Sequence, residues 1–136
     1  EGKKVIFTNG VFDILHTGHL RLLERARSLG DILIVGLNSD ASVRRLGKGT
    51  GRPINRWRDR AALLAALGCV DAVVAFSEDT PEKILSRLRP DILVKGADYR
   101  KDGIAGGRYA KKVVRIPIKP GYSTTGLIKR LQGVSR

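Results

Sequence analysis

The two histidines of the chain, His16 and His19, lie three residues apart, with Gly18 directly before the second. Chance would place two histidines in this pattern in about 1 chain of 600. A helix is predicted to open at Gly18, so its free N–H groups, its positive end and both imidazoles can face one anion. The glycine lets a phosphate come close to the backbone. The pattern predicts a phosphate site; the alternative is one surface histidine beside a helix-capping one.

Two further groups of residues are suited to a polyphosphate. Lys48 lies in a loop with glycines at 47, 49 and 51, where an amine can close over phosphates. Ser123, Thr124 and Thr125 stand where the last helix is predicted to begin, so hydroxyls and backbone N–H groups can bind an anion there. Such donors act on phosphates by positioning and by neutralising charge. With two histidines and one cysteine, the chain offers no structural zinc site, and we predict no metal bound by the protein.

Apolar strand-like runs alternate with helical patterns along the chain, and continuous apolar runs are typical of strands buried on both faces. The predicted strands are 5–8, 31–37, 71–76, 91–95 and 113–118. The predicted helices are 18–29, 39–46, 56–67, 80–88 and 123–131, with Thr80 capping the fourth and a loop over 103–108. This alternation indicates an α/β fold: a single Rossmann-like doubly wound domain, residues 1–136, with a five-stranded parallel sheet. Ligands in such folds bind at the carboxyl ends of the strands.

Charge sets this chain apart, because 26 Lys and Arg oppose 13 Asp and Glu, for a formal net charge of +13. A folded surface this basic attracts nucleic acid, an anionic membrane or phosphorylated small molecules, unless the excess is only compositional background. No apolar run approaches the roughly 20 residues of a membrane span, so no membrane partner is predicted. The lone Cys69 leaves no internal disulfide and favours the cytoplasm. Because the chain begins with Glu1 rather than methionine, we expect it to be cut from a longer one.

Several motifs resemble one family of enzymes. The stretch Thr8-Asn-Gly-Val-Phe-Asp-Ile-Leu-His-Thr-Gly-His19 closely resembles the opening motif of the cytidylyltransferase-like nucleotidyltransferases. Gly121-Tyr-Ser-Thr-Thr125 resembles the element that begins a late helix in that family. Arg52-Pro-Ile-Asn55 and Arg89-Pro-Asp-Ile-Leu-Val-Lys-Gly-Ala-Asp-Tyr99 resemble one branch, the heptose 1-phosphate adenylyltransferases. The resemblance covers almost the whole chain.

This resemblance implies transfer of an adenylyl group from ATP to D-glycero-β-D-manno-heptose 1-phosphate, with Mg²⁺ arriving with ATP. It implies that His16, His19 and Lys48 are catalytic. The implied nucleotide-binding residues are Thr8, Asn9, Gly10, Phe12, Gly18, Arg60, Gly121, Ser123, Thr124 and Thr125. The implied sugar-phosphate-binding residues are Asp13, Arg52, Asn55, Lys95 and Asp98. For Asp13 we favour orientation of its loop over contact with Mg²⁺ through water, and for Arg60 an ordinary solvated helix charge is the alternative.

Two departures from the family's patterns bear on the substrate. Cytidylyltransferases that act on glycerol phosphate carry an arginine where this chain has Ile118, which favours ATP over CTP, and residues 103–113 are several residues shorter than in the heptose branch. The alternatives are CTP with a polyol phosphate, ATP with a flavin phosphate, or a basic RNA-binding module on the same fold. Intact histidines and a full Ser-Thr-Thr favour the enzyme over a nucleic-acid partner. A homodimer is left open.

Overall fold

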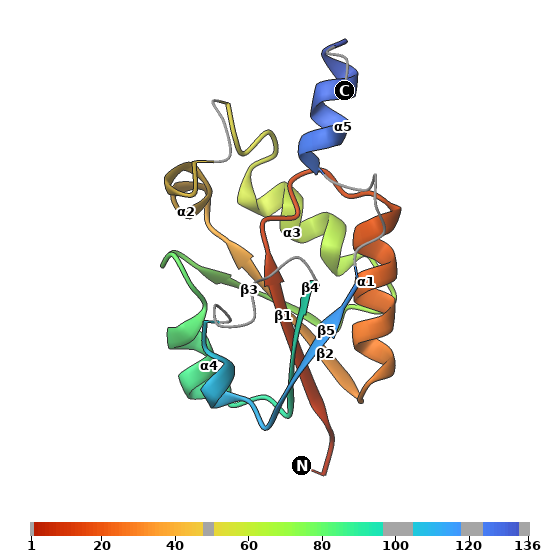
Figure 1. Cartoon of the computed structure of the whole chain (residues 1–136), viewed down its shortest axis with the longest axis vertical. Helices are drawn as coiled ribbons and strands as arrows, with labels where there is room; N and C mark the ends of the chain where they lie inside the picture. The colour runs from red at the N-terminus through yellow and green to blue at the C-terminus, as the bar shows by residue number, and fades with distance from the viewer. Residues whose placement is uncertain (1, 48–50, 97–104, 118–123, 134–136) are drawn as a thin grey trace.

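The computed structural model describes residues 2–47, 51–96, 105–117 and 124–133, without side chains for 124–127. Its strands are β1 (Val5–Gly10), β2 (Ile32–Asn38), β3 (Ala72–Phe76), β4 (Ile92–Gly96) and β5 (Lys112–Ile116). Its helices are α1 (Thr17–Ser28), α2 (Asp40–Arg45), α3 (Trp57–Ala65), α4 (Glu82–Leu88), the 3₁₀ turn η1 (Gly107–Tyr109) and α5 (Thr124–Leu131). In Figure 1 the strands form a central layer with helices on both sides. No helix in the described ranges is long and apolar enough to cross a membrane.

All five strands pair in parallel in the order β3-β2-β1-β4-β5, which confirms the predicted fold class. The central strand β1 is buried between two neighbours, with Thr8 opposite Val35 of β2 and Val94 of β4. The strand order reverses between β1 and β4. In open parallel sheets this point leaves a crevice beyond the carboxyl ends of the strands, where ligands bind.

Two apolar layers hold the helices on the sheet. On one face, buried Leu23 and Ala26 of α1 and Leu64 of α3 pack with Ile6 and Leu33 of the sheet. On the other face, Leu85 of α4 packs against Phe7 and Leu93. Each strand of this parallel sheet is therefore apolar on both faces near its middle, as the continuous runs in the sequence predicted.

An aspartate directly precedes each of three strands, and its side chain accepts a hydrogen bond from the start of a neighbouring strand. These three strands also begin at residues other than those predicted. Strands predicted to begin at Asp31, Asp71 and Asp91 begin one residue later. The Asp31 carboxylate accepts the N–H of Lys4, 2.8 Å away, and those of Asp71 and Asp91 accept the N–H groups of Leu33 and Val5 at 2.8 and 2.7 Å. Each side chain thus bonds the start of a neighbouring strand.

The fourth helix begins differently from the prediction. Pro81 is the N-cap residue of α4 and makes no side-chain cap hydrogen bond, so Thr80 is not the cap. The Thr80 hydroxyl donates to the Glu82 carboxylate at 3.1 Å instead. Gly107 and Arg108, which fall in the predicted loop over 103–108, instead begin the 3₁₀ turn η1, which contacts α4.

Candidate active site

The two histidines together build the N-terminus of α1. His16 is the N-cap residue in an extended conformation, and its Nδ1 accepts the N–H of Gly18 at 3.1 Å. In return, Nδ1 of His19 accepts the N–H of His16 at 3.2 Å. This is a capping box in which both partners are imidazoles. The capping alternative and the phosphate prediction are therefore compatible, because capping uses only one nitrogen of each ring.

This capping box selects one tautomer for both rings. Because Nδ1 of each imidazole accepts a backbone N–H, the neutral rings of His16 and His19 carry their hydrogen on Nε2. The rings are stacked, with centroids 3.8 Å apart and planes 22° from parallel. Stacking gives the two rings nearly the same orientation, so their Nε2–H groups can serve as a pair of neutral donors to one anion.

The surroundings keep these imidazoles uncharged. Burial, with a smaller contribution from the repulsion that a protonated His16 would exert, lowers the pKa of His19 to about 4. Burial also lowers the pKa of His16, and the positive charge of Arg130 on α5 adds to the shift. The effect of Arg130 shows that α5 lies close to the start of α1, as Figure 1 also shows. The first turn of α1 contains no acidic residue that would compete with an anion.

We expect acid to destabilise the fold through His19. The unfolded chain holds this imidazole near its ordinary pKa of 6.5, whereas the folded chain holds it near 4. The unfolded state thus takes up the proton first, so the contribution of His19 to stability is constant above about pH 6.5 and is lost progressively toward pH 4. An NMR titration of the ring should give a midpoint near 4. A midpoint near 6.5, or an equal fall in stability in His19→Asn, would contradict this.

The aromatic ring of Phe12 packs against the histidine pair. Its buried ring meets His19 edge to face, with centroids 5.2 Å apart. A Cβ at Gly10 would lie 2.9 Å from the Phe12 ring, so this glycine is required for packing. Phe12 itself has a left-handed backbone, with φ of 47°. The predicted contact of Gly10 and Phe12 with a nucleotide stays a prediction.

Asp13 is the centre of a buried network. Its carboxylate accepts Arg52 Nε at 2.8 Å and the backbone N–H groups of Ile54 and Asn55 at 2.8 and 2.9 Å. The Asn55 amide donates to the Asp13 carbonyl at 2.8 Å. The side chains of Asp13 and Arg52 are 0% and 6% exposed. This geometry agrees with our preference for Asp13 as an orienting residue. Binding of a sugar phosphate by Asp13, Arg52 or Asn55 stays a prediction.

Arg60 of α3 joins that network to the strand ends. Its side chain is fully buried, which overturns the alternative of a solvated helix charge. It donates to the Asn55 carbonyl at 3.0 Å, to the Val11 and Asn38 carbonyls at 2.9 Å, and to the Asp40 carboxylate at 2.6 Å. Arg60 thus holds the loop before His16 against α2 and β2. In this conformation the guanidinium is turned inward, and its predicted contact with a nucleotide stays a prediction.

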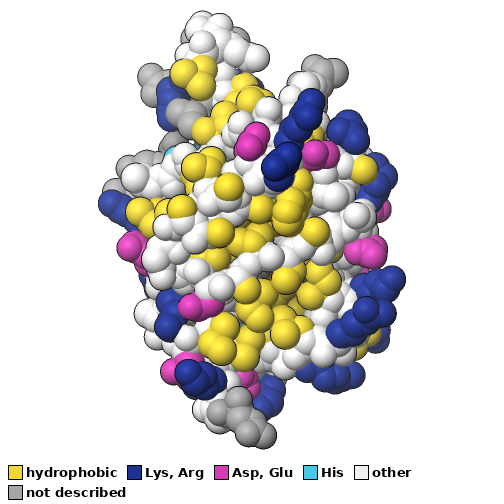
Figure 2. All heavy atoms as spheres, turned by 180° about the vertical axis from the view of Figure 1, so that it is seen from behind, with side chains coloured by type: hydrophobic (Ala, Val, Ile, Leu, Met, Phe, Trp, Pro, Cys, Tyr) yellow, Lys and Arg dark blue, Asp and Glu magenta, His cyan; other side chains and the backbone are white. Residues whose placement is uncertain are grey.

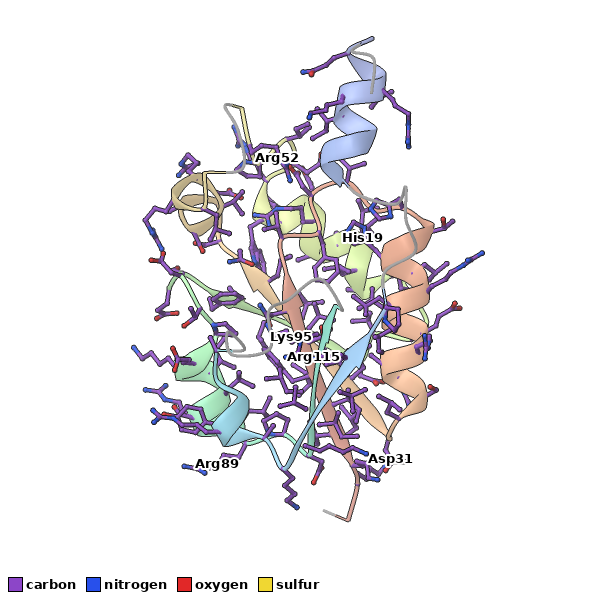
Figure 3. All side chains as sticks on the ribbon, in the orientation of Figure 1. His19, Asp31, Arg52, Arg89, Lys95 and Arg115 are labelled. Carbon is purple, nitrogen blue, oxygen red and sulfur yellow. The ribbon has the colours of Figure 1, made fainter. Side chains whose placement is uncertain are left out.

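Lys95 and Asn9 form a separate polar pair. Lys95 Nζ donates to Asn9 Oδ1 between the carboxyl ends of β4 and β1. Burial lowers the pKa of Lys95 to about 8, so the amine is mostly cationic at pH 7. Arg115 of β5 lies beside Lys95 in register. Figure 3 shows Lys95 and Arg115 well below Arg52, so among the described residues Lys95 does not join the predicted sugar-phosphate residues Arg52 and Asn55 around Asp13.

Some of the other predicted residues lie within the described ranges, and others lie outside them. The hydroxyl of Thr8 donates to the Val94 carbonyl at 2.9 Å and ties β1 to β4. Thr124 and Thr125 begin α5. The predicted residues outside the described ranges are Lys48, Asp98, Gly121 and Ser123.

A cleft of about 790 Å³ opens beside the Asp13 network. Arg44, Arg52 and Arg56 line it, and Asp40, which pairs with Arg60, is the acidic residue among the described lining. Such a cleft suits an anion. Sequence reasoning missed Arg44, Arg56 and Arg130, because none of them belongs to a motif and only the folded chain brings them near the site. Within the described residues, no group of three or more His, Cys, Asp or Glu could hold a metal.

Residues 7–130 match the family model described as cytidylyltransferase-like. The bifunctional protein HldE of Campylobacter concisus is 58% identical over 130 residues, which are 96% of this chain and 27% of that protein. HldE of Helicobacter pylori strain Shi470 is also 58% identical, over 96% of this chain and 28% of that protein. The chain thus spans little more than a quarter of these relatives.

Two solved structures share the fold. The lipopolysaccharide core biosynthesis protein from Thermoplasma volcanium superposes with a TM-score of 0.75 at 33% identity, over 87% of this chain and 99% of that chain. A pantoate-beta-alanine ligase from Francisella tularensis, complexed with beta-gamma ATP and beta-alanine, superposes with a TM-score of 0.61 over 98% of this chain and 66% of that one. At 15% identity the second likeness concerns the fold alone.

Proposed function

The chain belongs to the cytidylyltransferase-like family, and we propose that within it the chain transfers an adenylyl group from ATP to D-glycero-β-D-manno-heptose 1-phosphate. The products are ADP-heptose and pyrophosphate. The observation that carries this proposal is the pair of stacked, neutral imidazoles at the start of α1, in a chain 58% identical to HldE proteins over 130 residues. ATP as substrate favours the cytoplasm as the place of action.

The reaction needs no general base. An oxygen of the sugar phosphate, already anionic, attacks the α-phosphorus of ATP and forms a new P–O bond. The bond from the α-phosphorus to the bridging oxygen breaks, and pyrophosphate leaves with that electron pair. In the transition state, between the attack and the departure of pyrophosphate, negative charge grows on the α-phosphate oxygens. Catalysis then rests on positioning and on donors fixed before the reaction begins.

The described residues supply such donors. The Nε2–H groups of His16 and His19 would donate to the α-phosphate oxygens, and the positive end of α1 would add to their effect. Phe12 and the backbone bonds of the capping box hold the rings in place, so little reorganisation is required during the reaction. Lys48 and Ser123 to Thr125 would hold the β- and γ-phosphates. Lys95 or the arginine-lined cleft would take the anionic acceptor.

We expect activity to depend on Mg²⁺ supplied as the magnesium complex of ATP. The described residues hold no cluster suited to a resident metal, and Mg²⁺ prefers phosphate oxygens and several waters. Excess chelator should abolish pyrophosphate release, and added Mg²⁺ or Mn²⁺ should restore it. Stoichiometric zinc in the purified protein, or full activity in chelator, would contradict this expectation.

We expect kcat/KM for ATP to exceed that for CTP by at least about tenfold, which needs about 1.4 kcal/mol of differential transition-state binding. Ile118 stands where cytidylyltransferases of glycerol phosphate have an arginine, and the neighbouring Pro117 and Pro120 give an apolar segment that suits a purine. Competition kinetics with both nucleotides and heptose 1-phosphate measure this ratio.

The variant Ile118→Arg separates a side-chain effect from recognition by the backbone. If Ile118 favours the purine, the ratio for ATP over CTP should fall in this variant. An unchanged ratio would leave base selection to the backbone. Equal use of both nucleotides by the wild-type chain, or a preference for CTP, would instead favour the second candidate, a cytidylyltransferase, which the description of the family supports.

A further inference from the structure

Lys95 of β4 is buried, although lysine side chains usually lie in water. It is 4% exposed, whereas the other lysines in the described ranges are all exposed. Figure 2 shows the ordinary arrangement on one face of the molecule, where Lys and Arg side chains lie mainly around the margin of an apolar centre. Burying an ammonium group costs free energy, and burial lowers the pKa of this one to about 8. A buried cation of this kind is typical of a functional site.

Lys95 and Asn9 lie together at the point where the strand order reverses. Thr8 of β1 is opposite Val94 of β4, so the residues that follow them lie next to each other at the carboxyl ends of these two strands. Side chains alternate along a strand, which places Asn9 and Lys95 on the same face of the sheet. The crevice beyond such a point is where open parallel sheets bind their ligands.

The hydrogen bond between the two side chains fixes which atoms they offer to a ligand. Lys95 Nζ donates to Oδ1 of Asn9. Because an ammonium group only donates, the Asn9 amide turns its oxygen toward Lys95 and its Nδ2–H groups away from it. Among the described residues, no group accepts a hydrogen bond from Asn9 Nδ2. Hydroxyl oxygens accept from both ammonium and amide N–H groups, so the pair suits a ligand with several hydroxyl groups.

The position of the pair suits the sugar of the acceptor better than its phosphate. The phosphate of the acceptor has to attack the α-phosphorus, which the proposed reaction places beside His16 and His19 at the start of α1. Figure 3 shows Lys95 apart from His19, nearer the middle of the sheet. Since the chain leads from the end of β1 to His16, an acceptor whose phosphate lies at the histidines can extend its sugar over the ends of β1 and β4.

We propose that Asn9 and Lys95 bind hydroxyl groups of the acceptor sugar and thereby select among sugar 1-phosphates, an inference that rests on the proposed function. It assigns Asn9 to the acceptor, whereas the family resemblance implies a nucleotide contact. A sugar that lacks a matching hydroxyl, or carries it in the other configuration, leaves a buried ammonium or amide group without its partner. Sites built to bind a hydroxyl reject such analogues strongly for this reason.

Kinetics with heptose 1-phosphate and its monodeoxy analogues, one for each hydroxyl group, test the pair. We expect the wild-type chain to discriminate at least about tenfold, in kcat/KM, against the analogue that lacks the hydroxyl bound by Lys95. Lys95→Met fills similar space without the donors, so it should lose this discrimination and leave the KM for ATP nearly unchanged. Asn9→Asp keeps an oxygen for Lys95 but lacks the Nδ2–H groups, so it should lose discrimination against a different analogue.

The matched control is Lys112→Met. Lys112 is exposed at the first residue of β5, so the same substitution removes a lysine from the opposite end of the sheet. This variant should keep the discrimination of the wild-type chain. Unchanged discrimination in folded Lys95→Met and Asn9→Asp, or a rise in the KM for ATP in place of the acceptor effect, would overturn the proposal. An equal loss in Lys112→Met would overturn it too, since the lost charge alone would then explain the effect.

NMR of the wild-type chain tests the pair without turnover and without a variant that has to fold. The side-chain amide signals of Asn9 should shift with at least one of a panel of hexose and heptose 1-phosphates, and far less with inorganic phosphate at the same concentration. Equal shifts with inorganic phosphate, or no shift with any sugar 1-phosphate, would overturn the proposal. Absence of turnover with heptose 1-phosphate would contradict the proposed reaction alone, and the NMR titration would still decide whether the pair binds a sugar.

Discussion

Replacing His16 or His19 by alanine is expected to lower kcat about 10²–10³-fold while changing the KM for ATP far less, as for the loss of one donor to a developing oxyanion. Each Nε2–H group matters most when charge builds on the α-phosphate, and the rest of the polyphosphate is held elsewhere. Steady-state kinetics with ATP and heptose 1-phosphate measure both parameters.

Asparagine at either position separates catalysis from capping. The side-chain oxygen of asparagine can accept the backbone N–H that Nδ1 of His16 or His19 accepts now, and asparagine is among the best N-cap residues. The His16→Asn variant should therefore melt near the wild-type temperature yet lose kcat as the alanine variant does. Near-normal kcat in both asparagine variants would show that the imidazoles serve only the helix.

Removing the Asp13 carboxylate is expected to cost about 3–5 kcal/mol of folding free energy, because Asp13→Ala leaves the buried Arg52 guanidinium without its counter-ion. The same change leaves the backbone N–H groups of Ile54 and Asn55 without their acceptor. Urea unfolding at neutral pH, followed by circular dichroism, measures the loss.

The exposed Asp59 of α3 provides the matched control for Asp13. Asp59→Ala removes a carboxylate too, but from a solvated position. Apart from the effect on the helix dipole, it should change the free energy of unfolding by well under 1 kcal/mol. A cost at Asp13 no larger than that at Asp59 would mean that the buried network does not hold the loops of the site.

The order of strands and helices could be predicted because hydrophobic period and capping residues are local signals. The residues at which the strands and helices end could be predicted less well. β1 continues through Asn9 and Gly10, which have the composition of a turn, because both residues pair with β2. β5 ends at Ile116, before Pro117, although an apolar run continues to 118. Pairing with a neighbouring strand sets the end of β1, and the missing backbone donor of Pro117 sets the end of β5. Local propensity sets neither of them.

The site could be predicted where its parts are close in sequence. The pairing of His16 with His19 is a three-residue relation, and the helix that creates it is visible in the pattern. The hydrogen-bond partners of Arg60 could not be predicted from the sequence, because they include Val11, 49 residues away, and Asn38, 22 residues away. A basic residue on a helix usually lies in water, and only the folded chain shows that this one is buried.

Pyrophosphate release over a grid of nucleotides and acceptors tests the proposed reaction most directly. The grid combines ATP or CTP with heptose 1-phosphate, glycerol phosphate or a flavin phosphate, and mass spectrometry identifies the product. We predict rapid release with ATP and heptose 1-phosphate together, yielding ADP-heptose, and little with either alone or with the other pairs. Faster release with CTP and a polyol phosphate, or no release with any pair, would contradict the account.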